Sequence, residues 1–316
     1  MKFLKTILII IIILGVLAGG IVAIDYFTGI DIGIFDTAVL SENSYEVTEP
    51  YAKLIINSMV SDIEIVASDT GTTKIETKNR EGFNYEHGLD GETLRIVQKD
   101  NRKWYQKTGI FSKHNLLKVY VSKDFNGDVI IEGDSGDVTI NGITARTLNV
   151  EGDSGDIKIS TLIDIDSLDV ENDTGDIKIE NVSGEQVKVE TETGEVTLNS
   201  IDVSYLGAEA DTGSIMLTSI NATQNLIIST DTGDVDIKQA YGENISIKTD
   251  TGDVTFQDLD GKDIRLEADT GDISGNIISP KLYEAHTSTG KVEVPRSEAV
   301  ESRCYVRTHT GDIKIS

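Results

Sequence analysis

The sequence is poor in cysteine, proline and basic residues, and each shortage excludes a class of protein. Cys304 is the single cysteine among 316 residues, which excludes an internal disulfide framework and a cysteine-based zinc cluster. Only 3 prolines accompany 29 glycines, so turns are frequent and linkers are scarce. Lys and Arg number 28 against 54 Asp and Glu, which gives a net charge of −26. Nucleic-acid binding is not expected, because phosphate contacts need clustered Lys and Arg.

A long uncharged segment follows the first lysines. Lys2 and Lys5 precede an apolar run from Ile7 to Ile24. As a helix this run covers about 27 Å, close to the ~30 Å hydrocarbon core of a bilayer. The alternative is a cleaved signal peptide, whose apolar region is shorter, about 7–15 residues. We favour an uncleaved anchor for this reason.

The position of the lysines predicts the orientation of the chain. Positive residues before a membrane span are retained in the cytoplasm, so the N-terminus is expected there. Residues 1–24 are then the cytoplasmic tip and transmembrane anchor of a single-pass protein of the cell membrane. Everything after Asp25 is expected to be extracytoplasmic.

Residues 25–124 divide into two stretches. Residues 25–50 have no clear period and are interpreted as a stalk. From residue 51, short runs alternate apolar and polar residues, for example Asp62–Val66 and Leu117–Val121, which is typical of strands. Because no stretch after residue 25 keeps a 3.6-residue period, the extracytoplasmic part is predicted to be all-β. Residues 51–124 form its irregular N-terminal β segment, which is expected to cap the repeats that begin near residue 125.

These repeats share a short phrase. Ser or Thr is followed by Gly, usually by Asp, and then by Val or Ile. Its ten copies are spaced by 19–21 residues, a period typical of solenoids. Glycine is expected to take the positive-φ position of a turn. The turn glycines are Gly136, Gly155, Gly175, Gly194, Gly213, Gly233, Gly252, Gly271, Gly290 and Gly311.

Each copy supplies too few apolar residues for a core of its own. Val138, Ile140, Leu148 and Val150 alternate with polar residues, as expected for strands with one buried face. Stacked coils would bury a continuous core through contacts between neighbours. Residues 125–316 are therefore predicted to form a parallel β-solenoid (β-helix) of about ten coils of 19–20 residues. Such a rod is roughly 45–50 Å long.

The anchor, the irregular β segment and the stacked Ser/Thr-Gly-Asp-Val/Ile repeats together resemble the bacterial "putative adhesin" β-solenoid family. The resemblance covers about residues 45–316. It implies a cell-envelope domain of unknown function that occurs with envelope-stress genes of Gram-positive bacteria. The family supplies no catalytic motif to carry over.

The acidic residues of the repeat have two interpretations. In the first, the Asp before the turn Ser or Thr bonds back to the turn amides, and the motif is structural. In the second, stacking places Asp231, Asp250 and Asp269 about 5 Å apart, where calcium would relieve their repulsion. We favour the structural turn, because Asp137 directly precedes Val138, whereas calcium-binding nonapeptide repeats separate the Asp from the apolar residue. No metal or cofactor is assigned.

One segment opposes the acidic trend. It lies between the strands expected near residues 93–98 and 116–122, so we place it on a long loop. Basic and aromatic side chains together suit anionic polymers, headgroups or sugars. The alternative is a solvated loop whose Trp packs on the first coil. The candidate binding residues are Lys99, Arg102, Lys103, Trp104, Tyr105 and Lys107.

These features predict a non-catalytic, membrane-anchored cell-envelope protein, acting in adhesion or as an envelope-stress scaffold. The expected partners are the membrane, through the N-terminal helix, and an envelope polymer or protein. The alternatives are a carbohydrate-active enzyme on a β-helix and a calcium-dependent surface module. The final repeat, Asp312–Ser316, has no cap after it, so the C-terminal coil is predicted to self-associate or to accept a partner strand.

Overall fold

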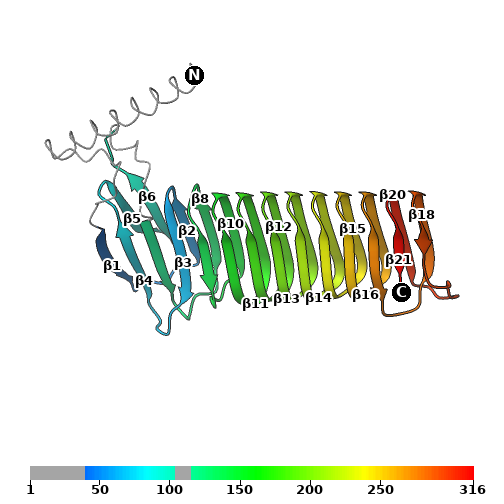
Figure 1. Ribbon diagram of the computed structural model, residues 1–316. Coiled ribbons are helices and arrows are strands. Elements are labelled where there is room, and N and C mark those ends of the chain that lie inside the picture. Colours follow the sequence, from blue (N-terminus) through cyan, green and yellow to red (C-terminus); the bar gives the residue numbers. More distant parts are fainter. Residues whose placement is uncertain (1–39, 104–114) are drawn as a thin grey trace, which may run out of the picture.

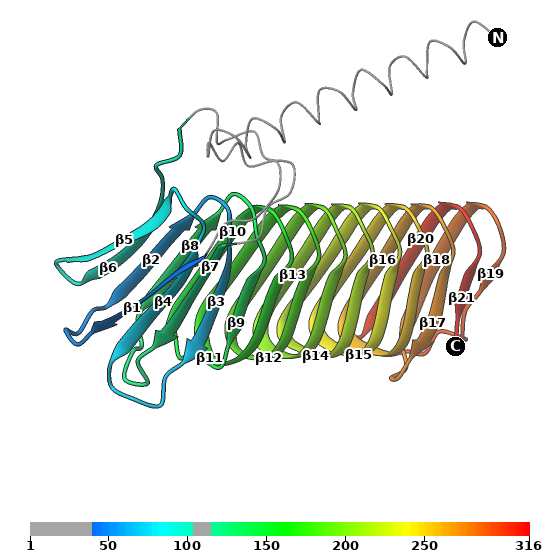
Figure 2. The same cartoon turned by 60° about the vertical axis from the view of Figure 1, so that its left-hand side comes forward.

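The computed structural model describes residues 40–103 and 115–316, which form an elongated all-β rod (Figure 1). Figure 2 shows the coils stacked one behind another along the rod. Within the described residues no helix is long and apolar enough to cross a membrane. The predicted anchor, residues 1–24, and most of the predicted stalk lie outside them.

The regular part of the rod is a β-solenoid, as predicted. Each coil is one long strand that bends at a corner and pairs in parallel with the coils before and after it. Ile177, for example, pairs with Val196, and Val196 pairs with Ile215. These long strands are β11 (Ile157–Thr174), β12 (Ile177–Thr193), β13 (Val196–Thr212), β14 (Ile215–Thr232), β15 (Val235–Thr251) and β16 (Val254–Thr270), and the shorter β10 (Thr147–Ser154) pairs with β11 before them.

Aliphatic side chains fill the space between the two faces of the rod. In β12, Ile177, Ile179, Val187 and Val189 alternate with less buried residues and are each 0% exposed. The same positions of the other coils join them in one continuous core. The solenoid has about nine turns rather than the predicted ten, because the repeats at its far end do not each complete a turn.

At the N-terminal end, the order of the strands in space differs from their order in the chain. The strands concerned are β2 (Lys53–Ser58), β3 (Ser61–Ala67), β6 (Thr93–Asp100), β7 (Asn115–Val121), β8 (Asp128–Gly133) and β9 (Val138–Asn141). β2 and β3 pair in parallel with β8 and β9 on one side, and with β6 and β7 on the other. Part of the 51–124 segment therefore continues the stack of coils.

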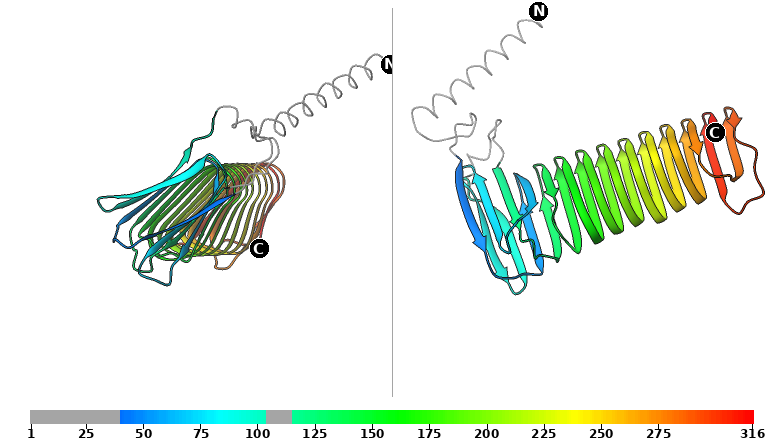
Figure 3. Two further views of the ribbon diagram at one scale, coloured as in Figure 1. Left: turned by 90° about the vertical axis from the view of Figure 1, so that its left-hand side faces the viewer. Right: turned by 90° about the horizontal axis from the view of Figure 1, so that it is seen from below.

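Antiparallel strands cover this end of the stack. β4 (Thr73–Asn79) pairs with β7, β1 (Ser41–Val47) pairs with β4, and β5 (Phe83–Asp90) pairs with β6. In the end-on view of Figure 3 these strands fan out beyond the outline of the coils. The change from parallel to antiparallel pairing ends the stacking of coils here.

The C-terminal end is permuted in the same way. β20 (Arg303–Thr310) lies between β16 and β18 (Leu282–Thr289) and pairs in parallel with both (Figure 1). β21 (Ile313–Ile315) lies likewise between β17 (Ile273–Ile277) and β19 (Val292–Glu293). The last two strands of the chain, β20 and β21, are therefore inner strands, and β18 and β19 are the outermost ones.

The prediction that the final repeat is an open edge is therefore wrong. Ile313 is only 1% exposed, because strands cover it on both sides. The edge of β18 is itself partly capped: Tyr283 N–H donates to Ser297 Oγ at 2.9 Å, and this hydroxyl donates to the Tyr283 carbonyl at 3.3 Å. Such a cap shortens the stretch of backbone open to unwanted pairing. Self-association stays a prediction, and the strand that could support it is β18.

The turn glycines are required by both backbone conformation and stacking distance. All ten have positive φ, from 119° at Gly155 to 157° at Gly194. A Cβ built on any of them would lie 1.7–2.3 Å from a backbone carbonyl oxygen of the adjacent coil. That distance is far inside van der Waals contact, so glycine alone fits at this turn.

A second corner lies six residues after each turn glycine of the regular coils. Residues other than glycine occupy it in six coils, with φ between 55° and 60°. Asn and Asp are the usual non-glycine choices for this left-handed conformation, and a β-branched residue such as Thr161 is rare there. The corner residues are Thr161, Asn181, Ser200, Ser219, Gln239 and Asp258.

We expect Gly155→Ala to lower the free energy of unfolding by about 3 kcal/mol or more, since strain and overpacking each cost about 1–3 kcal/mol. Gly133→Ala is the matched control, because a Cβ there meets nothing within 4 Å and its φ is not in the left-handed region. The control should be neutral or slightly stabilising. Urea unfolding followed by circular dichroism measures both, and equal losses would contradict the stacking argument.

Candidate functional site

The acid that follows most of the turn glycines forms a ladder between coils, which Ser214 and Lys291 interrupt. Asp234 Oδ1 accepts a hydrogen bond from the backbone N–H of Asp253, and Asp253 Oδ1 accepts one from Asp272, both at 2.8 Å. The same contact recurs along the rod, from Asp137 to Asp312. These carboxylates therefore hold neighbouring coils together.

The acid before the turn, which was expected to bond back to the turn amides, does not do so. Asp231, Asp250 and Asp269 occupy equivalent surface positions in successive coils. Asp250 pairs with Lys248 at 2.6 Å, and Asp269 Oδ1 lies 3.2 Å from His309 Nδ1. In residues 40–103 and 115–316, no group of three or more His, Cys, Asp or Glu is arranged to hold a metal ion.

Buried threonines satisfy the carbonyl groups of the turn. The hydroxyls of Thr230, Thr249 and Thr308 are buried. They donate to the carbonyl oxygens of Gly213, Gly233 and Gly271, respectively, at 3.0–3.2 Å. The polar groups around the repeated motif are thus used to join one coil to the next.

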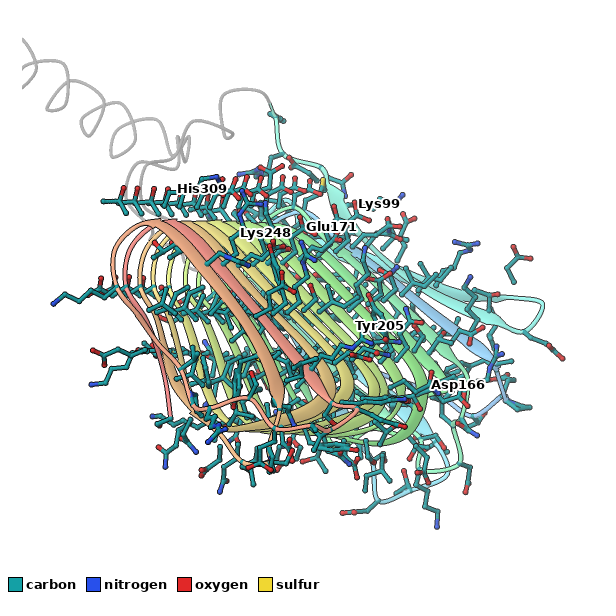
Figure 4. The ribbon with its side chains drawn as sticks, turned by 90° about the vertical axis from the view of Figure 1, so that its right-hand side faces the viewer. Lys99, Asp166, Glu171, Tyr205, Lys248 and His309 are labelled. Carbon is teal, nitrogen blue, oxygen red and sulfur yellow. The ribbon has the colours of Figure 1, made fainter. Side chains whose placement is uncertain are left out.

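Two acidic rows run side by side along one edge of the rod. In the first row five glutamates are in register, followed by Ser229, Lys248, Glu267 and Arg307. The second row contains the acids before the turns, followed by His309 and Ser288. Figure 4 labels Glu171, Lys248 and His309 along this edge. The five glutamates are Glu132, Glu151, Glu171, Glu190 and Glu209.

A shallow groove lies on the outer face of the solenoid near its C-terminal end. Alternate residues of β14, β15, β16 and β20 line it in two rows along the rod axis. Sequence reasoning missed this groove because its residues come from four coils and share no motif. The first row is Asn225, Asn244, Asp263 and Arg303, and the second row is Ile227, Ser246, Arg265 and Tyr305.

The predicted basic and aromatic segment is only partly described. Lys99 lies on β6 and pairs with Glu86 at 3.8 Å. Arg102 donates to both oxygens of Asp100, at 2.9 and 3.1 Å, and its guanidinium lies 4.1 Å from the centroid of the Phe83 ring. Arg102 is thus engaged within the protein, as is Lys103. Trp104, Tyr105 and Lys107 lie outside the described residues.

The thiol of Cys304 is buried inside the stack. Burial raises its pKa to about 12, so the thiol stays protonated at neutral pH. A protonated, buried thiol is a poor nucleophile.

A buried ion pair ties the permuted end to the last regular coil. The side chain of Lys281 is 0% exposed, and its Nζ donates to Asp260 Oδ1 at 2.8 Å and to Ser279 Oγ. Burial acts to raise the pKa of Asp260, but the hydrogen bonds from Lys281 and Ser279 outweigh it, so this pKa lies below its ordinary value. Asp260 belongs to β16 and Lys281 immediately precedes β18.

A family model described as Toastrack DUF4097 matches residues 51–240 and 238–316. The chain belongs to this family. The match begins just before β2, so it includes the irregular β segment as well as the regular coils. The resemblance inferred from the repeats is thereby confirmed.

Three solved bacterial structures are similar to this toastrack chain over most of its length. A "putative lipid binding protein" from Parabacteroides distasonis is 12% identical, covers 87% of this chain and 97% of its own, and has a TM-score of 0.48. A "putative adhesin" from Bacteroides fragilis is 14% identical, covers 87% and 97%, and has a TM-score of 0.36. Another from Parabacteroides distasonis is 11% identical, covers 88% and 98%, and has a TM-score of 0.41. No curated protein matches the chain.

The acid ladder can be separated from a calcium site by substitution. Asp253→Asn keeps an acceptor oxygen for the Asp272 N–H and removes one of several like charges, so we expect the Tm to stay or rise slightly. Asp253→Ala removes the acceptor and should cost about 1 kcal/mol. Thermal unfolding with and without calcium measures both effects. A calcium-dependent rise in Tm that Asp250→Asn abolishes would favour the calcium interpretation instead.

Asp260→Ala is expected to lower the free energy of unfolding by about 3 kcal/mol or more, because it leaves the buried Lys281 charge without its partner. Lys281→Met should cost less, since Asp260 keeps 25% of its side chain exposed and can be hydrated. Urea unfolding at neutral pH measures this asymmetry. Equal losses in the two variants would contradict it.

The same pair predicts a loss of stability in acid. Because folding lowers the pKa of Asp260, its contribution is present above the unfolded-state pKa, about 3.9, and is lost as the pH falls through the folded-state value. Lys281→Met should therefore lose less stability over that range than the unaltered chain. Urea unfolding repeated between neutral and acidic pH measures the difference.

Proposed function

We propose that this toastrack protein is a non-catalytic, membrane-anchored rod of the cell envelope, acting as an adhesin or as a scaffold in the envelope-stress response. The observation that carries the proposal is the use of the repeat's polar groups in stacking. Acids after the turn, such as Asp234, accept backbone N–H groups, and buried threonines such as Thr249 bond to glycine carbonyls. Polar groups that join one coil to the next extend the rod. A long rod suits a protein that presents a surface away from the membrane.

The charge of the rod supports the same role. In the proposed topology, residues 1–24 hold the N-terminal end of the rod at the membrane, and the permuted C-terminal end lies farthest from it. The net charge of −26 repels an anionic lipid or wall surface, which favours a rod that stands away from both. The outer face near the C-terminal end is then the part most available to a partner.

The two alternative functions have less support from the geometry. For an enzyme, the carboxylates are periodic and engaged in stacking, and the one thiol is buried and protonated. For a calcium-dependent module, two of the three candidate aspartates already lie beside Lys248 and His309.

The topology is tested by adding protease to intact cells that make the full chain. We expect degradation of the rod and survival of a short N-terminal fragment. Cleavage only after the cells are lysed would contradict an extracytoplasmic rod.

The role of length is tested by removing two whole coils, residues 137–175, which joins Gly136 directly to Asp176 in the same position of the repeat. The rod then shortens by about 10 Å, while both ends and the outer groove are kept. We expect attachment of cells that make this variant to fall below that of cells with the full rod. Undiminished attachment, at equal surface amounts of protein, would rule out a role for length.

A further inference from the structure

One tyrosine lines the outer groove, and a second lies beyond it along the rod axis. At one end, Tyr305 is held between the Arg265 guanidinium, 4.8 Å from its ring centroid, and the His286 ring, 6.5 Å away. Beyond the other end, Tyr205 lies over Gly207: a Cβ on that glycine would come 3.1 Å from the tyrosine hydroxyl. Figure 4 places Tyr205 on the lateral face of the rod. The two tyrosines are separated by β14, β15 and β16, hence by about 19 Å.

The floor of the groove combines one exposed apolar side chain with hydrogen-bonding groups. Ile227 is 43% exposed and lies in register with Ser246 and with Gly207. Asn244 Nδ2 donates to Asn225 Oδ1 at 3.2 Å, which leaves the Asn225 amide N–H groups and Asn244 Oδ1 for a ligand. An exposed aliphatic patch beside amides and hydroxyls is suited to a sugar chain, whose rings carry C–H faces and hydroxyl edges.

The charges of the groove balance one another. Both hydrogen bonds between Arg265 and Glu267 are 2.7 Å long. Asp263 and Arg303 lie opposite each other in register, and neither makes a side-chain hydrogen bond or ion pair with another described residue. Their charged groups therefore remain available to hydroxyls, with no net charge between them.

The neighbouring acidic rows decide which polymer fits. An anionic chain lying along the axis would meet the field of Asp231, Asp250 and Asp269, the acids of the second row on the same coils, and a cationic one would bind more strongly on those acids than in the balanced groove. This field neither attracts nor repels an uncharged chain. We propose that the groove binds an uncharged polysaccharide whose chain runs along the rod axis.

This inference rests on the proposed envelope function, because a protein of the cell envelope is exposed to such polysaccharides. It is tested on the purified full chain in a detergent without sugar headgroups, so it can fail independently of the attachment assay. The probes are cellohexaose, laminarihexaose and maltohexaose, with hexameric polygalacturonate as the anionic comparison. Calorimetric titration at low and high salt should show binding of at least one uncharged probe, with an affinity that salt does not change.

Four variants locate the binding. Tyr305→Ala and Arg303→Ala should each weaken binding by about fivefold or more, equivalent to about 1 kcal/mol. Tyr241→Ala is the matched control, since this tyrosine is 49% exposed on the same solenoid but lies outside the groove. Tyr305→Phe keeps the aromatic wall and separates loss of the ring from misfolding. The proposal is overturned if no uncharged probe binds, if only polygalacturonate binds, or if Tyr241→Ala is as damaging as Tyr305→Ala.

Discussion

The rod depends on the close approach of two backbones at each turn glycine. At that point the glycine N–H donates to the carbonyl of the residue before the glycine in the next coil, as from Gly213 to Thr232 at 2.9 Å. A side chain would push the coils apart and break the parallel hydrogen bonds on the flanking strands, whose buried polar groups would then lack partners. The spacing of the glycines, the constant coil length and the continuous core all follow from this contact.

The same stacking places like charges above one another, and the structure offsets this repulsion locally. Carboxylates after the turn accept backbone N–H groups, while outward lysines pair with acids two residues away, as Lys158 does with Asp156 and Lys188 with Glu190. The Lys158 hydrogen bond outweighs burial and lowers the pKa of Asp156. The remaining negative field covers most of one edge, so the charge-balanced groove at Asp263 and Arg303 stands apart from the rest of the surface.

The sequence is sufficient to predict the solenoid and its buried face, because a period-2 pattern and a recurring glycine each have one structural cause. It is not sufficient to predict the order in which the strands stack at the two ends of the rod. The repeats are so alike in pattern that they fit beside one another equally well, and nothing in β18 or β20 alone shows which of the two lies inside. The second corner escaped notice because Thr161, Asn181 and Gln239 share only a backbone conformation. The groove and the buried Lys281 also arise from stacking, which brings together residues that no local motif links.

The inward position of β20 has a consequence for synthesis. A ribosome makes β18 before β20, so the emerging chain can first lay β18 directly on β16, with Glu284 in the place that Tyr305 finally takes. If β18 does so, the later strand has to displace it outward by one layer. Until that exchange is complete, the groove lacks both Arg303 and its aromatic end wall. Ligand binding would therefore distinguish fully folded molecules from those in which β20 has not yet inserted between β16 and β18.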